Sequence, residues 1–166
     1  MAKPRFFLTP AEYLSTAGRM SRMQYFVHGL LFAAVMFSGF MLMGASGLVD
    51  EGISTPQAAL IYLAVMLPFL YLLVCLYAKR LHDLGWTAWW CVLALFDLPF
   101  DLGVTVANAF MVVPETIISA NNIIGMVGNV TGLGLGLVLT FKAGDRGPNK
   151  YGPDPLRPPQ LDTTVF

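Results

Sequence analysis

The charged segment Lys79–Trp86, with the sequence KRLHDLGW, lies between two long apolar runs. Its arginine could donate to an anionic group such as a lipid phosphate, and His82 beside Asp83 is a pair that acid–base or metal chemistry uses. A metal-dependent hydrolase needs several ligands, and the only other histidine is His28. We therefore predict no metal site and no catalytic residues, and the chain also lacks GxxxxGK[ST] and GxSxG motifs.

Two further polar segments, one near each end of the chain, carry side chains that could join this one. One interpretation is a site for an anionic group such as a lipid phosphate, to which the Gly144–Gly152 loop adds backbone amides. The other, which we favour, is that Asp83 pairs with Arg19, Arg22 or Arg80 and locks helix ends together. The residues of this predicted cluster are Arg19, Arg22, Lys79, Arg80, His82, Asp83, Arg146 and Asn149.

Asp97 and Asp101 interrupt an apolar run and would share a face if one helix continued through both. A carboxylate in the middle of a bilayer costs about 2.5–3.5 kcal/mol, so such acids are functional candidates. They could form a proton or cation relay. Equally, Pro99 between them could mark a helix break at which the acids cap amides or face an outer vestibule. The run could therefore be one helix or two pieces joined at Pro99.

Two weaker signals lie in other apolar runs. Gly128, Gly132 and Gly136 have the four-residue spacing that lets helices approach closely, within one chain or between two copies. His28 could ligate a haem or chlorophyll-type pigment, although a lone histidine is more often a hydrogen-bonded helix contact. We therefore predict no cofactor, and expect bound lipid instead.

The composition indicates that these residues belong to a membrane protein. The chain has 166 residues, of which 56% are hydrophobic and 12% charged, and its mean hydropathy is +0.64. A soluble domain carries roughly twice that charge, about 25%. A membrane helix takes about 20 apolar residues, and four such runs fill most of the sequence. The predicted spans are residues 25–48, 57–78, 87–113 and 117–141.

The predicted fold is therefore an all-α membrane protein with four transmembrane helices. Residues 1–24 form an N-terminal segment, in which Thr9–Glu12 is a capping box that starts a short interfacial helix at about Pro10–Ser15. The transmembrane domain is 25–141, and 142–166 is an irregular tail. All ten basic residues lie in the N-terminal segment, the middle loop or the tail. The positive-inside rule therefore places both termini in the cytoplasm.

Three blocks of the sequence resemble a known family. They are GRMSRMQYF (Gly18–Phe26), KRLHDLGW followed by Trp89, and GDRGPNKYGPDP (Gly144–Pro155). In this order they are similar to the signature blocks of domain of unknown function 805, the YhaH-like proteins of the bacterial inner membrane. The resemblance implies a small helical inner-membrane protein and no established activity. The chain departs from the family pattern in the longer apolar stretch between Pro99 and Gly132.

Three functions are compatible with these features. The first is a non-enzymatic accessory or scaffold subunit of a larger membrane complex, which the short loops and the absence of a catalytic set favour. The second is a proton- or ion-conducting component that uses Asp97 and Asp101. The third is a protein that binds anionic lipid at the cytoplasmic face. The expected partners are membrane lipids, with other inner-membrane proteins or a second copy as further candidates, and no nucleic acid.

Overall fold

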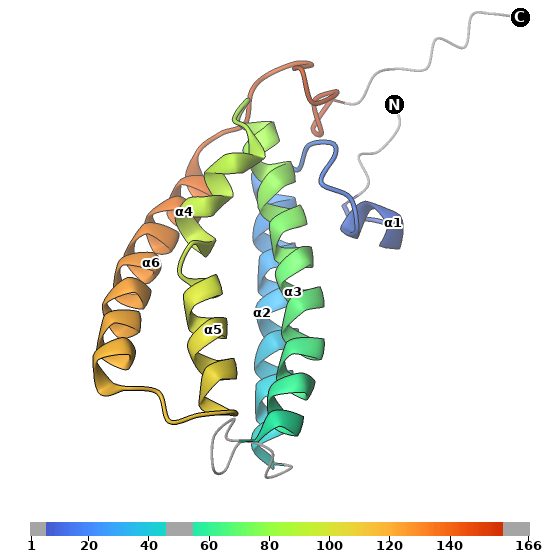
Figure 1. Cartoon of the computed structure of the whole chain (residues 1–166). Helices are drawn as coiled ribbons and strands as arrows, with labels where there is room; N and C mark the ends of the chain where they lie inside the picture. Colours follow the sequence, from blue (N-terminus) through green and yellow to red (C-terminus); the bar gives the residue numbers. More distant parts are fainter. Residues whose placement is uncertain (1–5, 46–54, 158–166) are drawn as a thin grey trace, which may run out of the picture.

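The computed structural model describes residues 6–45 and 55–157, and within these ranges the chain is helical with no strand. The long helices lie roughly side by side, and the N-terminal segment, the end of α3 and the tail lie together at one end (Figure 1). In chain order the elements are α1 (Pro10–Tyr13), α2 (Arg22–Ala45), α3 (Pro56–Asp83), the 3-10 helix η1 (Ala88–Cys91), α4 (Val92–Leu95), α5 (Leu98–Asn108) and α6 (Glu115–Phe141).

Three of the described helices, α2, α3 and α6, are long and apolar enough to cross a membrane. The segment Ala88–Leu95 and α5 meet that test together, but they are bent by 46° at the break between them. The number of candidate spans is therefore three, or four if the bent pair is one span. Outside the described residues lie the acidic residues Asp50 and Glu51, the basic residues Lys3 and Arg5, and the tail beyond Arg157.

The first five residues of the charged segment Lys79–Trp86 are helical and do not form the predicted loop, because α3 continues to Asp83. Nothing in KRLHD disfavours a helix, and the first helix-ending signal is Gly85, which has φ +72°. The Trp86 amide donates to the Leu81 carbonyl at 2.9 Å, and the Gly85 amide donates to His82 at 3.1 Å. This is a Schellman motif, in which glycine supplies the left-handed residue after the helix.

The third predicted span is broken, and the break lies just before Pro99. The helix α4 ends at Leu95, and Pro99 occupies the first turn of α5. A proline ring clashes with the carbonyl four residues earlier in a continuous helix. That carbonyl belongs to Leu95, so the helix ends there. Asp97 consequently lies at the break rather than on a continuous helix with Asp101.

One small cluster of buried apolar side chains lies at the same end as the charged residues. Leu81, Leu84, Leu135 and Leu139 form its centre, where the end of α3 meets the end of α6. Farther along the helices the apolar side chains are largely exposed, and in α2 only 6% of the most apolar window is buried. Apolar surface of this extent is suited to contact with lipid or with partner helices.

The short first helix agrees with its sequence signal. Thr9 caps α1, and its capping box with Glu12 is confirmed: the Glu12 amide donates to the Thr9 hydroxyl oxygen at 3.3 Å, and Glu12 Oε2 accepts from the Thr9 amide at 2.6 Å. The helix is shorter than predicted and ends at Tyr13. The Tyr71 hydroxyl of α3 donates to the Leu14 carbonyl at 2.7 Å, which holds this segment against α3.

Candidate functional site: a charge-locked polar cap

Asp83, the last residue of α3, lies between two arginines. Arg19 donates to Asp83 Oδ1 from Nε at 3.1 Å and from Nη2 at 3.0 Å. Arg80, one turn earlier on α3, donates from Nη1 to Oδ2. The side chains of Arg19, Arg80 and Asp83 are 1%, 0% and 4% exposed. One buried carboxylate thus neutralises part of two buried guanidinium charges, so removing it would leave both charges without a counter-ion.

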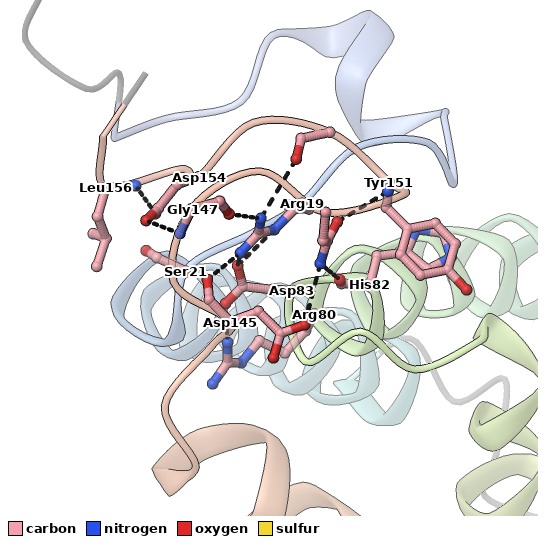
Figure 2. Close-up of polar contacts among 12 residues, drawn as sticks. Arg19, Ser21, Arg80, His82, Asp83, Asp145, Gly147, Tyr151, Asp154 and Leu156 are labelled. Atoms are coloured by element: carbon pink, nitrogen blue, oxygen red, sulfur yellow. Dashed lines mark hydrogen bonds and ion pairs between the residues drawn. The ribbon is translucent and has the colours of Figure 1, made fainter. Parts of the chain in front are cut away.

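The remaining guanidinium donors bond to backbone carbonyls of the tail and of α6. Arg19 reaches the carbonyls of Gly147 and Asp145, each at 2.6 Å. Arg80 donates from Nε to the Leu139 carbonyl at 2.6 Å and from Nη2 to Lys142. Figure 2 shows Arg19 reaching both Asp83 and the tail. The two arginines therefore join the N-terminal segment, α3, α6 and the tail. We call this joined region, residues 18–22, 79–86 and 142–157, the polar cap.

The tail also bonds directly to the last turn of α3, where helix carbonyls lack partners within the helix. The Asp145 amide donates to the Asp83 carbonyl at 2.7 Å, and Asn149 Nδ2 donates to the His82 carbonyl at 2.9 Å. The Tyr151 ring stacks on His82 with centroids 3.8 Å apart and planes 8° from parallel. Residues 142–157 of the tail thus form an irregular loop that is docked on the end of α3.

Asp154 organises the tail internally. Its carboxylate accepts the Gly147 amide at 3.1 Å and the Leu156 amide at 2.9 Å. Burial opposes ionisation of this carboxyl, but the amides of Leu156 and Gly147 and the charge of Arg19 outweigh that effect and lower its pKa. The ionised form of Asp154 therefore stabilises the loop.

Lys79 holds the N-terminal segment against α3. Its ammonium donates to the carbonyls of Glu12 and Ser15, while its own carbonyl accepts the Met20 amide at 3.2 Å. The Met20 side chain is completely buried, and His82 Nδ1 lies 3.2 Å from the Gly18 carbonyl. The N-terminal segment is thereby bound along the end of α3.

The structure brings most of the predicted polar cluster together, with Asp83 paired to Arg19 and Arg80 rather than to Arg22. Six of the eight predicted residues make the contacts described above. Arg22 and Arg146 are different, because both are exposed and line a cavity of about 150 Å³ beside Asp83. The cap thus contains the two ion pairs of Asp83 with Arg19 and Arg80, which we call the lock. Next to the lock, Arg22 and Arg146 face a cavity.

Asp97 and Asp101, the two acids of the broken segment Ala88–Asn108, lie in different surroundings. The Asp97 side chain occupies the space beside Gly128 of α6, where an added methyl group would collide with its carboxylate. Asp97 makes no side-chain capping bond to α5. Asp101 is exposed, and its Oδ1 lies 3.4 Å from Asn121 Nδ2 of α6. Its charge also acts on the nearby Tyr62 phenol of α3.

The structure shows the surroundings of the evenly spaced glycines of α6 and of His28 in α2. Gly132 lies against Ala94, whose Cα is 3.4 Å from the position of an added Cβ, whereas nothing lies within 4 Å of that position at Gly136. His28 is buried, with Nδ1 2.7 Å from the Gln24 carbonyl and Nε2 accepting the Leu8 amide at 3.5 Å. Both ring nitrogens are therefore engaged by the chain itself.

Sequence reasoning missed the residues that shape the tail, namely Gly144, Asp145, Tyr151 and Asp154. An added Cβ at Gly144 would collide with the Asp83 carboxylate, so only glycine permits this approach. The signal was present in GDRGPNKYGPDP, because closely spaced glycine, asparagine, aspartate and proline are typical of tight turns. Among the described residues no group of three or more histidines, cysteines or acids is arranged to hold a metal ion.

The comparisons with known proteins identify a family. No curated protein and no solved structure matches the chain. A family model described as "Protein of unknown function (DUF805)" matches residues 13–153, which contain all the residues of the lock and the whole of the broken segment. The family resemblance predicted from the three sequence blocks is thereby confirmed. The chain belongs to the DUF805 family.

Proposed function

We propose that this protein is a non-enzymatic accessory or scaffold subunit of a larger complex in the bacterial inner membrane. In this proposal the bent pair is one span, so the chain crosses the bilayer four times with both termini in the cytoplasm. The polar cap then lies at the cytoplasmic face, and membrane lipid covers the helix surfaces that no partner occupies.

The distribution of charge supports this topology. Arg19, Arg22, Lys79 and Arg80 belong to the end of the molecule at which the tail also lies, whereas Glu115 begins α6 at the opposite end (Figure 1). Positive charge at one face is the pattern that orients inner-membrane proteins. An even number of spans returns both ends of the chain to that face.

The observation that carries the accessory role is the exposed carboxylate of Asp101. It lies seven residues before the end of α5, or about 10 Å along the helix at 1.5 Å per residue. A charge at such a depth costs about 2.5–3.5 kcal/mol. The sequence has no lysine or arginine from residue 81 to residue 141, nor from 23 to 78. The apolar spans therefore contain no cation that could neutralise Asp101.

A second copy of the chain has the same apolar spans, so self-association does not supply the missing cation either. A basic side chain in the membrane helix of a different protein would supply it. The contacts of the polar cap also favour a structural role, because the functional groups of Arg19, Arg80 and Asp83 are occupied by bonds to one another and to backbone carbonyls.

The test is a gentle purification of the tagged protein from its own membrane, followed by quantitative mass spectrometry. We expect a stoichiometric partner with a basic residue in a predicted span. In Asp101→Asn the yield of that partner should fall about tenfold or more, because the carboxylate no longer compensates the partner's charge. Glu115→Gln is the matched control, since Glu115 is an exposed acid at the start of α6. Purification of a monomer with lipid alone would overturn the proposal.

A proton or cation path through Asp97 and Asp101 is the second candidate, favoured by the polar neighbours of Asp101, Asn121 and Tyr62. It predicts proton flux in proteoliposomes that hold the purified protein alone. Replacement of both acids by asparagine should abolish that flux, and flux unchanged in the double variant would exclude the path.

A further inference from the structure

We propose that the cavity beside Asp83 binds a phosphate group, that of a phospholipid headgroup or of a small soluble phosphate ester. The cavity has a volume of about 150 Å³ and lies between the start of α2, the end of α3 and the tail. One water molecule needs roughly 10–15 Å³ of such space, so the cavity has room for a larger polar group. This site is separate from Asp101 and does not depend on the accessory role.

The carboxylates in the cavity wall already have partners. Asp83 is paired with Arg19 and Arg80. Asp154 accepts two backbone amides. Asp145 Oδ2 lies against Gly85 and 3.4 Å from Asn149 Nδ2. The acids therefore serve internal contacts, and they do not present a row of unpaired negative charge to a ligand.

The cations in the wall are in the opposite situation. Arg22 at the start of α2 and Arg146 in the tail both line the cavity and are exposed, and neither takes part in the ion pairs of the lock. Arg22 is also close enough to the buried Arg80 for the two like charges to repel each other. Two guanidinium groups from different segments are suited to bind the oxygens of one phosphate.

The position of the cavity indicates why a lipid headgroup fits. It lies at the start of α2, at the end of α3 and beside the segment that follows α6. These are the levels at which helices of membrane-spanning length reach the lipid headgroups. Basic pockets at this level of membrane proteins bind anionic lipid headgroups. Pro155 and the exposed Leu156 also line the cavity and offer apolar contact to the glycerol part of a lipid.

The test uses the full-length protein with Arg22 and Arg146 both changed to glutamine. Arg157→Gln is the matched control, because Arg157 is an exposed arginine of the same tail that does not line the cavity. Each variant is reconstituted with phosphatidylglycerol and phosphatidylcholine in equal amounts, and retained lipid is measured by native mass spectrometry. A second arm measures binding of soluble glycerol 3-phosphate by calorimetry.

We expect the double variant to retain about tenfold less phosphatidylglycerol than the wild-type protein, because two charge-assisted contacts are lost, and the control to retain a normal amount. Loss in the lipid arm identifies a headgroup site, and loss in the soluble arm alone identifies a small phosphate ester. A thermal unfolding midpoint equal to that of the wild-type protein shows that the double variant is folded. Binding unchanged in both arms overturns the proposal.

Discussion

Asp83 is the residue on which the polar cap depends, because it is the shared counter-ion of two buried arginines. Each guanidinium also bonds to carbonyls from other segments, so the position of Asp83 determines where those segments meet. Breaking a buried ion pair by removing one partner is more costly than its net contribution suggests, since the remaining charge stays buried and unpaired. The negative charge of the Asp83 side chain therefore matters more for stability than the volume of that side chain.

Asp83→Asn removes the charge but keeps the size and shape of the side chain. This change should therefore destabilise the protein by about 3–5 kcal/mol. Thermal unfolding in mild detergent, followed by tryptophan fluorescence, measures this difference. Arg146→Gln, an exposed change in the same cap, should stay within about 0.5 kcal/mol. Equal stability of Asp83→Asn and the wild-type protein would show that the lock is not formed.

Asp154 provides a pH-dependent contribution with a defined sign. Its pKa in the folded chain is lowered, chiefly because the amides of Leu156 and Gly147 and the charge of Arg19 outweigh the effect of burial. The unfolded value is about 3.9. The stabilisation is therefore fully present above about pH 4 and is lost as the pH falls through the folded pKa.

The unfolding midpoint of Asp154→Asn should accordingly lie below that of the wild-type protein at neutral pH, and the difference should begin to shrink once the pH falls below about 4, toward the lowered folded pKa of Asp154. The comparison is a series of thermal unfolding curves for the two proteins from pH 7 to pH 3. A difference that stays constant across this range would mean that Asp154 is not ionised in the cap.

At the level of elements, sequence predicted which helices exist better than where they end. The apolar runs predicted α2, α3 and α6, because membrane helices are set mainly by length and hydropathy. The charged residues after Ala78 predict an earlier end for α3, whereas the backbone signal that ends this helix is Gly85. The break before Pro99 follows from one steric clash, which the sequence indicated without fixing its exact position.

The close approach of α6 to the broken segment gives a prediction about two glycines on one helix. Gly128→Ala should destabilise the protein by about 1–3 kcal/mol, because the methyl group would displace Asp97. Gly136→Ala should be neutral or stabilising by up to about 1 kcal/mol, since nothing lies near its Cβ position. Thermal unfolding of the two variants decides this, and equal losses would argue against the α6 packing described here.

For the whole molecule, the arrangement joins residues 18–22 of the N-terminal segment and residues 142–157 of the tail at one end of the helices. The sequence predicted that Arg19, Asp83 and Asn149 could converge, because the positive-inside rule assigns their segments to the same side. It could not predict the particular pairs, since these depend on how the tail folds over the end of α3. The glycine, asparagine, aspartate and proline residues of the tail indicate turns. They do not indicate which residues of α3 and the N-terminal segment the tail contacts, because those contacts depend on the tertiary structure.

The proposed topology predicts the behaviour of reporter fusions. Green fluorescent protein fused after Phe166 should fluoresce, and alkaline phosphatase at the same place should be inactive, because the proposed topology places the C-terminus in the cytoplasm. Both results should reverse when the reporters are fused after Pro114, between α5 and α6. Active phosphatase at the C-terminus would contradict the proposed cytoplasmic position of that terminus.

The joining of the N-terminal segment, α3 and the tail through Asp83 is the central structural claim, and hydrogen exchange tests it most directly. The measurement compares the wild-type protein and Asp83→Asn in lipid nanodiscs by mass spectrometry. We predict that residues 18–22 and 143–157 are protected in the wild-type protein and lose protection together in the variant, while the middle of α3 does not change. Rapid exchange of the wild-type tail, or protection that the variant retains, would contradict the account.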